Sequence, residues 1–315
     1  MEEICISICI PAYKRTGYLN RLLHSISIQT FRNYEVVITD DSPGDELKQL
    51  LEEYRHTFPY LHYHKNEKQL GTPENWNAAV SRARGTWIKL MHDDDWFTGP
   101  DSLHRFAEAA SDNSVSFIFS AYTNVTEISG LQASVMPSAW RLKQLRKRPM
   151  TLLSRNIIGP PSVTLYRRAD SGKYDANMKW LVDVDFYMQV MNTTTPFFLR
   201  DNLIFVGVGD EQVTASVHGV KEVELPEHGR LLRKQGIGQF RNVLVYDYWW
   251  RLFRNFDIRK SNDLLPYWEK DLLYPVFVSM LRWQNRVPVS LLKIGVLSKV
   301  LMFLHYLANR NKLSA

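Results

Sequence analysis

The sequence predicts an α/β fold in which a mostly parallel sheet is flanked by helices and followed by a helical C-terminal extension. Strand-like and helix-like segments alternate over residues 4–125, which is typical of a parallel sheet covered on both faces. From about residue 226 the chain becomes mostly helical in pattern and rich in Trp, Tyr and Arg. These two patterns place an α/β domain over residues 1–225 and a helical, basic, aromatic-rich region over residues 226–315.

The elements of the first part can be assigned one by one. Apolar and β-branched runs predict strands at 4–10, 33–41, 61–66, 86–92 and 114–125. Helical spacing of apolar residues predicts helices at 17–29, 45–58, 73–85 and 99–111, the third with Pro73 near its start and Gly85 at its end. Further along, we expect a strand at 162–168, a helix at 179–192 and strand material at 197–208.

The composition is that of an ordinary globular protein with a large core. The 315 residues are 45% hydrophobic, which fits one large domain or two modest ones. Cys5 and Cys9 lie four residues apart on one strand face, too far along it to bond each other, so we expect buried thiols in a reducing compartment. The acidic N-terminus lacks a signal-peptide pattern, and no stretch reaches the ~18 apolar residues of a membrane span. We therefore expect a cytoplasmic protein.

Charge is distributed unevenly along the chain. Residues 221–315 hold 16 basic and 8 acidic residues, whereas the rest of the chain is slightly acidic. In the last segment, Ser298, Lys299, His305, Asn309 and Arg310 fall on one side of a helical wheel. Two interpretations stay open: a basic amphipathic region peripheral to an anionic membrane, or a helical subdomain that packs on the first domain or on a second protomer in a homo-oligomer.

Acidic residues follow two of the predicted strands. The segment WIKLMHDDDWF (87–97) ends an apolar strand in Asp93, Asp94 and Asp95, and the strand at 33–41 ends in Asp40 and Asp41. The carboxyl ends of parallel strands share one edge, where ligands bind. Neighbouring carboxylates repel one another, and hard divalent cations bind such oxygens together with substrate phosphates. This pattern favours a metal site over a solvated acidic turn.

The first strand is followed by PAYKRTG, which contains neither a P-loop nor GxGxxG. A P-loop kinase and a dinucleotide-dependent dehydrogenase are therefore disfavoured. A nucleotide would be held in another way. Tyr13 could stack on a base, Asp41 could bond the base edge, and Arg15 could contact phosphate.

Five segments in order, namely ISICIPAYKR, SISIQTFRNYEVVITDDS, the NWN helix, ARGTWIKLM and HDDDWF, resemble the family 2 glycosyltransferases over about residues 4–200. The resemblance implies a GT-A fold, a nucleotide-sugar donor, a divalent metal (Mn or Mg) and transfer with inversion. Residues 1–225 would then be the nucleotide-sugar-binding catalytic domain.

The resemblance also implies roles for individual donor-side residues. Pro11, Ala12 and Tyr13 match the lining of the base and ribose, and Asp41 matches the position that bonds the base. Asp93 would face ribose or metal, and Asp94, followed by Asp95, aligns with the metal-binding acid.

Three positions depart from the family pattern, one of which is Val182, in place of the usual Glu immediately before Asp183. His92 replaces the common first Asp of the DxD-type motif, which leaves its role open. Trp76 stands where many members have Arg, so any phosphate contact of that Arg is missing, and Asn77 matches the following Asn.

The proton-accepting base and the acceptor side fall later in the chain. In KWLVDVDFYMQV, Asp183 aligns with the family's base, and the alternative is that it only caps the helix. His218, in a segment similar to a late loop that closes over the diphosphate, is a further candidate metal ligand. Trp180 and Pro161 are candidates for the acceptor side.

The sequence thus predicts an inverting, metal-dependent glycosyltransferase that uses a UDP-sugar and a glycan or lipid-linked acceptor in surface polysaccharide assembly. A nucleotidyltransferase is a weaker alternative, because the first turn holds only Gly17. A non-catalytic module binding membrane or nucleic acid is disfavoured by the acidic strand ends, and we expect no nucleic-acid partner.

Overall fold

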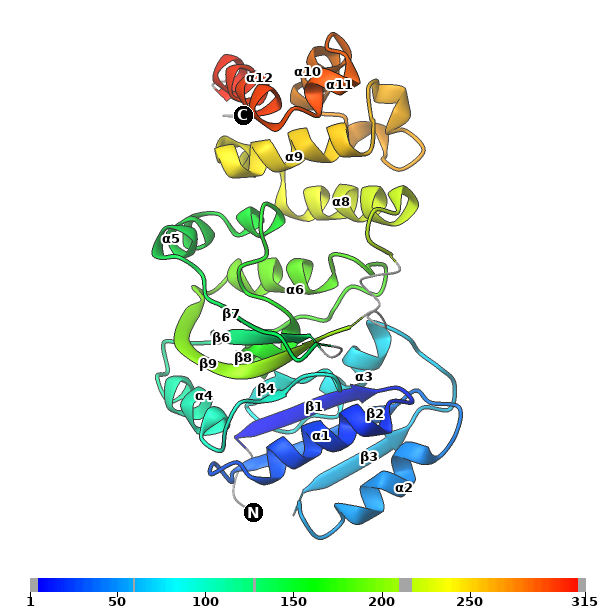
Figure 1. Cartoon of the computed structure of the whole chain (residues 1–315), viewed down its shortest axis with the longest axis vertical. Coiled ribbons are helices and arrows are strands. Elements are labelled where there is room, and N and C mark those ends of the chain that lie inside the picture. Colours follow the sequence, from blue (N-terminus) through cyan, green and yellow to red (C-terminus); the bar gives the residue numbers. More distant parts are fainter. Residues whose placement is uncertain (1–4, 59, 127–128, 210–216, 311–315) are drawn as a thin grey trace. The chain divides into compact units, whose positions relative to one another are not determined.

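The computed structural model describes residues 5–58, 60–126, 129–209 and 217–310, and its chain divides into two compact units (Figure 1). Unit 1 comprises Met1–Leu142, Ile157–Ala176 and Asp185–Gln212, and unit 2 comprises Lys143–Asn156, Asn177–Val184 and Val213–Ala315. Each unit therefore combines separate stretches of sequence. The division of function between residues 1–225 and 226–315 stays a prediction.

Unit 1 is built on one mixed sheet. The strands follow the order β3-β2-β1-β4-β8-β6-β9-β5, with β7 paired to β6. Their bounds are β1 Ile6–Ala12, β2 Tyr34–Asp40, β3 Leu61–Lys65, β4 Trp87–Leu90, β5 Trp96–Phe97, β6 Phe117–Thr126, β7 Gln132–Val135, β8 Thr164–Arg167 and β9 Phe197–Val208. The predicted α/β fold is confirmed, and β1, β2, β3 and β4 pair in parallel as expected, whereas β8 pairs antiparallel with β4 and β6, so the sheet as a whole is mixed rather than mostly parallel. The short strands β5 and β7 were not predicted.

The helices of the first part also follow the prediction. Their bounds are α1 Thr16–Ser27, α2 Glu46–Glu53, α3 Glu74–Ser81, α4 Ser102–Ala110, α5 Ala139–Lys147 and α6 Val182–Met191. Only α5 was not predicted, and it has little apolar periodicity because a single residue, Leu145, is buried. Short 3-10 helices lie at Pro149–Leu153, Pro161–Val163 and Arg168–Asp170.

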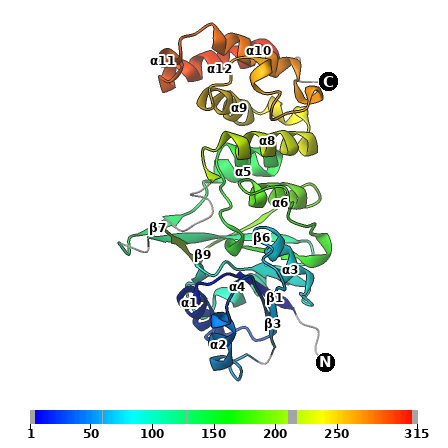
Figure 2. The same ribbon diagram turned by 90° about the vertical axis from the view of Figure 1, so that its right-hand side faces the viewer.

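The first strands of the sheet are parallel neighbours. β1 pairs with β2 on one side and with β4 on the other, and Ala12 is in register with Asp40. Helices α1 and α2 cover one side of these strands and α3 covers the other (Figure 2), as right-handed crossovers require when the strand order reverses at β1. The carboxyl ends of β1, β2 and β4 therefore meet at one edge.

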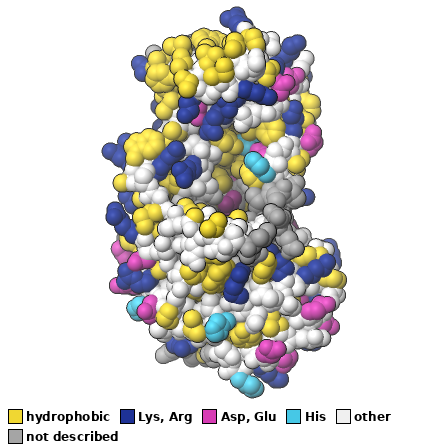
Figure 3. All heavy atoms as spheres, viewed as in Figure 1, with side chains coloured by type: hydrophobic (Ala, Val, Ile, Leu, Met, Phe, Trp, Pro, Cys, Tyr) yellow, Lys and Arg dark blue, Asp and Glu magenta, His cyan; other side chains and the backbone are white. Residues whose placement is uncertain are grey.

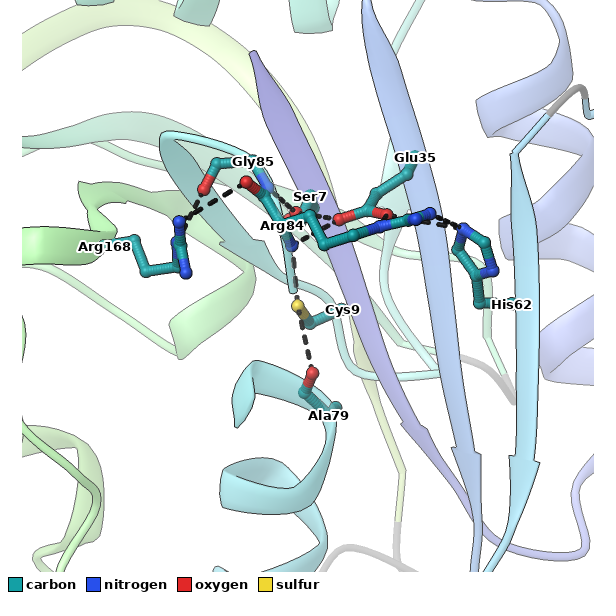
Figure 4. A network of polar contacts seen from close by, with 8 residues as sticks. All are labelled: Ser7, Cys9, Glu35, His62, Ala79, Arg84, Gly85 and Arg168. Atoms are coloured by element: carbon teal, nitrogen blue, oxygen red, sulfur yellow. Dashed lines mark hydrogen bonds and ion pairs between the residues drawn. The ribbon is translucent and has the colours of Figure 1, made fainter. Parts of the chain in front are cut away.

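A buried polar network stabilises the opposite, N-terminal end of the same strands (Figure 4). The fully buried Glu35 carboxylate accepts hydrogen bonds from Ser7 Oγ at 2.6 Å and from the Arg84 backbone N–H at 2.6 Å, and Arg84 Nε lies 3.1 Å away. His62 Nε2 is 3.4 Å from the same carboxylate. This network links β1, β2 and β3 to the segment that leads into β4.

Unit 2 is mainly helical and has an aromatic core. Its helices are α8 Lys221–Gln235, α9 Val243–Asn255, α10 Pro275–Asn285, α11 Val289–Leu292 and α12 Gly295–Asn309, with 3-10 turns at Ile237–Arg241, Ser261–Asp263 and Lys270–Leu272. Trp249 is fully buried, and its ring lies 5.3 to 5.6 Å from those of Phe240, Trp268 and Phe277. The aromatic residues that enrich this part of the sequence are therefore core residues.

The two cysteines are thiols and do not form a disulfide: Cys9 is fully buried as predicted, whereas Cys5 is only half-buried. Within the described ranges, every helix is too short or too polar to cross a bilayer.

Candidate active site

The polar residues predicted at the strand ends lie at one edge of the sheet in unit 1. The Asp41 backbone N–H donates to Ala12 O at 3.0 Å, and the Lys14 backbone N–H donates to Ser42 Oγ at 2.7 Å, so the turns after β1 and β2 are joined. Lys14 adopts a positive φ of 63°, an uncommon conformation for a non-glycine residue. This tight turn directs Arg15 toward the residues that follow β4.

Arg15 forms an ion pair with the first two aspartates after β4. Its guanidinium pairs with both oxygens of Asp93, with Nε 3.2 Å from Oδ2, and its Nη1 lies 3.5 Å from Asp94. Burial raises the pKa of Asp93 to about 7 and Asp94 adds to the increase, although Arg15 acts in the opposite direction. The side chain that the sequence assigned to phosphate thus contacts the acidic motif in this structure.

His92, Asp94 and Asp95 form a cluster in which one ligand atom from each residue lies within 4.8 Å of the others. The sequence predicted Asp94, Asp95 and His218 as metal ligands and left the role of His92 open. Nε2 of His92 and Oδ2 of Asp95 are buried and have no hydrogen-bond partner among the described residues. Buried polar atoms normally have partners. One imidazole nitrogen and two carboxylates also suit a divalent metal, so the residues present fit such an ion.

The surroundings of this cluster hold its ligands in place. The His92 backbone N–H donates to Ser162 Oγ at 2.9 Å, and Asp95 Oδ1 accepts from the Gly207 backbone N–H at 3.1 Å. A Cβ atom at Gly207 would lie only 2.6 Å from the Asp94 carbonyl oxygen, so this approach requires glycine. Burial, together with the charge of Asp94, raises the pKa of Asp95 well above its usual value. A bound cation would favour the charged form instead.

Trp76 and Asn77, on α3, support the cluster from the side. The Trp76 ring lies 4.8 Å from the His92 ring and 5.2 Å from the ring of Tyr174. Asn77 donates through Nδ2 to Tyr174 O at 2.9 Å and accepts from Tyr174 N–H at 3.0 Å. Asn77 therefore joins α3 to the segment around Tyr174, and its predicted contact with the donor stays a prediction.

Asp41 is buried and binds the loop at 66–71. Its carboxylate accepts hydrogen bonds from Asn66 Nδ2 at 2.6 Å, from Gly71 N–H at 2.7 Å and from Leu70 N–H at 3.1 Å. A base bonded by Asp41 would share this carboxylate with the loop. Tyr13 is 39% exposed, and Lys14 Nζ lies over its ring, 4.9 Å from the ring centroid.

Asp183 lies at the start of α6, in unit 2. Its Oδ2 accepts a hydrogen bond from Asn156 Nδ2 at 3.0 Å, and its Oδ1 accepts from Val184 N–H at 2.8 Å. Burial raises the pKa of Asp183 to about 6, although these hydrogen bonds partly oppose the shift. The sequence alone did not decide whether Asp183 is a catalytic base or only a helix cap. Its raised pKa suits a group that accepts protons near neutral pH.

Glu227, on α8, holds the segment that leads into Asp183. Its carboxylate accepts hydrogen bonds from the backbone N–H groups of Lys179 at 2.6 Å, Trp180 at 3.0 Å and Leu181 at 2.8 Å. A carboxylate at this position stabilises the N-terminus of a helix. Sequence reasoning missed Glu227 because no local motif connects it to residues more than 45 positions earlier.

The remaining predicted residues are divided between the units. Trp180 and His218 stack in unit 2, with ring centroids 4.9 Å apart, and His218 Nδ1 lies 3.6 Å from Glu224. Pro161 is buried in unit 1 at the start of a 3-10 helix. Residues 210–216 of the predicted late loop lie outside the described residues. The roles of these three residues stay predictions.

An α/β sheet whose parallel strands end in an acidic, metal-compatible cluster is the arrangement of a GT-A-type fold. The particular family follows from the sequence itself: residues 7–174 match Glycosyl transferase family 2, and the chain belongs to that family. This agrees with the resemblance seen in the sequence and disfavours the nucleotidyltransferase alternative.

Curated relatives are similar over most of the α/β part. An uncharacterized protein of Mycobacterium tuberculosis is 28% identical over 63% of this chain and 65% of its own length. An uncharacterized glycosyltransferase of Haemophilus influenzae is 24% identical over 64% of this chain and 67% of its own length. Abequosyltransferase RfbV of Salmonella typhimurium is 36% identical, over 29% of this chain and 28% of its own length. The match thus spans about two thirds, or less, of these relatives.

Solved structures share the fold over nearly the whole chain. S. aureus TarS 1–349 in complex with UDP-GlcNAc superimposes with a TM-score of 0.62 and 18% identity, covering 98% of this chain and 90% of that one. The mannosyltransferase PcManGT from Pyrobaculum calidifontis, in complex with GDP-Man and Mn2+, gives a TM-score of 0.57 with 12% identity over 96% and 86% of the two chains. At this identity the likeness establishes the fold.

Proposed function

We propose that this family 2 glycosyltransferase moves a sugar, with inversion, from a nucleoside-diphosphate donor to an acceptor hydroxyl group, and that the donor nucleoside is uridine. The observation that carries the proposal is the His92–Asp94–Asp95 cluster, which has two buried, unpartnered ligand atoms at the edge where β1 and β4 end. The complexes of TarS with UDP-GlcNAc and of PcManGT with GDP-Man and Mn2+ support the donor class and the metal.

In this proposal His92, Asp94 and Asp95 hold a divalent cation. When bound, the cation would neutralise charge on the diphosphate leaving group. Because an imidazole nitrogen favours transition metals over magnesium, we propose manganese rather than magnesium. His218 remains a proposed additional ligand.

The donor nucleotide would lie along the turns after β1 and β2. The partly exposed Tyr13 would stack on the base, with Pro11 and Ala12 beside it at the end of β1, and Asp41 would bond the base edge. Asn77 and Asp93 complete the proposed donor side. Arg15, which contacts Asp93 in this structure, would exchange this carboxylate for a phosphate group of the donor.

Asp183 is the proposed base for the acceptor. With a pKa near 6 its carboxylate is mostly deprotonated at neutral pH, so it can take the proton of the attacking hydroxyl. Asn156 fixes the orientation of the carboxylate through the 3.0 Å hydrogen bond to Oδ2. Trp180 and Pro161 are proposed on the acceptor side, where the Trp180 ring would stack on a sugar.

The proposed setting is the assembly of a surface polysaccharide, with a glycan or lipid-linked acceptor, on the cytoplasmic face of a membrane. Similarity to an abequosyltransferase supports the transfer of a sugar, and two cysteines in the thiol form fit a reducing compartment. A homo-oligomer is compatible with this setting, and we propose no nucleic-acid partner.

The test is binding and hydrolysis of a panel of nucleotide sugars, with and without manganese, by the wild type and by Asp94→Ala. We expect one donor to bind only with metal and Asp94→Ala to abolish that binding, with Asp201→Ala as an exposed control. A chain that binds no nucleotide sugar under any condition would contradict the proposal.

A further inference from the structure

Helix α12 has its polar and apolar sides exchanged relative to an ordinary surface helix. Ser298, Met302 and His305 are buried, whereas Val300 is 50% exposed and Leu304 is 50% exposed. At 100° per residue these two sets point to opposite sides of the helix. The polar set predicted from the sequence is thus divided: Ser298 and His305 face inward, and Lys299 and Arg310 are exposed.

Specific hydrogen bonds determine this orientation. Ser298 Oγ accepts from Trp250 Nε1 at 3.1 Å and from Arg254 Nη1 at 3.0 Å. The His305 ring is bonded at both nitrogens, to the Tyr246 hydroxyl at 2.7 Å and to the Ser279 hydroxyl at 2.8 Å. Turning the apolar side inward would leave these buried polar groups without partners, which is costly. Hydrogen bonds within unit 2 therefore hold the apolar side of α12 outward.

Eight exposed apolar residues lie within α11, within α12 or between these two helices, and we call this set the α11–α12 face; Figure 3 shows hydrophobic side chains gathered at this end of the chain with Lys and Arg among them. The face consists of Val289, Leu291, Ile294, Val296, Val300, Phe303, Leu304 and Leu307, each between 39% and 77% exposed. An apolar set of this size is uncommon on a surface that faces only water.

The charged residues of the segment that forms the α11–α12 face have one sign. From Arg282 to the C-terminus the sequence holds six basic residues and no acidic residue. Five of the basic residues are described, and all five are exposed, namely Arg282, Arg286, Lys293, Lys299 and Arg310. An exposed apolar surface on a segment whose charged residues are all cations is complementary to a surface that offers acyl chains beneath anionic headgroups.

We propose that the α11–α12 face binds the surface of an anionic lipid bilayer. The 15 residues of α12 extend only about 22 Å, less than the ~30 Å of the hydrocarbon core, so the helix would lie in the plane of the membrane. A second copy of the chain could also cover this face. If the faces of two copies met, however, the basic residues of one copy would lie opposite the basic residues of the other and repel them. The inference deepens the proposed function, because a bilayer would place the enzyme beside a lipid-linked acceptor.

The test is co-sedimentation with vesicles of phosphatidylcholine alone or mixed with phosphatidylglycerol, without donor or acceptor. We expect the wild type to bind the anionic vesicles only. Val300→Ser with Leu304→Ser should lower the partition coefficient about tenfold, and Lys293→Gln with Lys299→Gln about fivefold for each lysine. The control pair Leu131→Ser and Met136→Ser, which are exposed apolar residues of unit 1, should bind like the wild type.

Two results would overturn the inference. One is that the wild type does not bind anionic vesicles. The other is weak vesicle binding together with a dimer, detected by sedimentation velocity, that is lost in the double variant Val300→Ser with Leu304→Ser. In that case the face would bind a second copy of the chain. Donor hydrolysis without vesicles is measured on the same variants. Intact hydrolysis with no vesicle binding contradicts this inference alone, and vesicle binding with no hydrolysis contradicts the proposed function alone.

Discussion

The ring of Trp76 lies 4.8 Å from the ring of His92, so two of the positions at which the sequence departs from the pattern of the family it resembles contact each other. Trp76 stands where many members have Arg, and His92 stands where they have Asp. The contact suggests that the two replacements act together, with the indole ring holding the imidazole beside Asp94 and Asp95.

This relationship predicts an altered preference for metal. His92→Ala should weaken Mn2+ binding by about tenfold or more, and Trp76→Leu should weaken it less, because the imidazole is kept but no longer held. His92→Asp should raise the affinity for Mg2+ relative to Mn2+, since a carboxylate replaces a nitrogen ligand. Electron paramagnetic resonance of Mn2+ with the donor-free protein measures the binding. His64→Ala, at an exposed histidine of β3, is the control, and equal Mn2+ affinity in the wild type and His92→Ala would refute the role of His92.

Asp183→Asn should lower the turnover of transfer by about 10²- to 10⁴-fold and leave donor binding unchanged, because only the proton acceptor is lost. Asn keeps the size of the side chain, so folding should be preserved. Steady-state kinetics and donor titration separate the two effects. Asp201→Asn, an exposed residue, should behave as the wild type. Loss of donor binding in Asp183→Asn would show that the residue is not specific to the acceptor step.

The pKa of Asp183 predicts the acid side of the pH profile. A base must be deprotonated, so the ratio kcat/KM should increase as the pH rises through about 6 and level off above it. Asn156→Ala removes the 3.0 Å hydrogen bond that favours the charged form, so the midpoint should move to higher pH. A midpoint that is the same in both proteins would indicate that another group controls the profile.

Glu227 should affect the acceptor step through the position of Asp183. Glu227→Ala leaves three backbone N–H groups without their acceptor, so we expect a lower thermal midpoint and a turnover about tenfold lower, with donor affinity unchanged. Glu222→Ala, at an acidic residue in the first turn of the same helix, is the control. A variant that loses stability but keeps wild-type turnover at low temperature would limit Glu227 to a structural role.

Glu35 should make stability depend on pH. Burial alone would raise its pKa, but the hydrogen bonds from Ser7 and Arg84 outweigh burial and lower it. A lowered pKa means that this contribution is present above the unfolded-state value of about 4.3 and is lost as the pH falls through the folded-state value. Glu35→Ala should cost about 3 kcal/mol at pH 7, measured by urea unfolding, and the cost should shrink in acid. A cost that does not change with pH would contradict the assignment.

Local patterns along the chain are sufficient to predict the fold and much of the donor side. Alternating strand and helix patterns predict a parallel sheet, because the spacing of apolar residues in each segment reflects local backbone geometry. Once the strands are parallel, the strand ends before Tyr13, Asp41 and Asp93 must share an edge. The motifs and their order are also properties of the sequence, so the family can be identified from the amino acids alone.

Tertiary packing, in contrast, selects which side chains meet. The pairing of Arg15 with Asp93, the grouping of His92 with Asp94 and Asp95, and the carboxylate of Glu227 beneath Trp180 depend on how the chain folds back on itself, and no periodicity encodes such contacts. The helical wheel of α12 grouped Ser298, Lys299 and His305 on one side, but the structure buries Ser298 and His305 and exposes Lys299. That burial depends on partners for Ser298 and His305 that other helices supply, because a buried polar group is stable only when it is hydrogen-bonded.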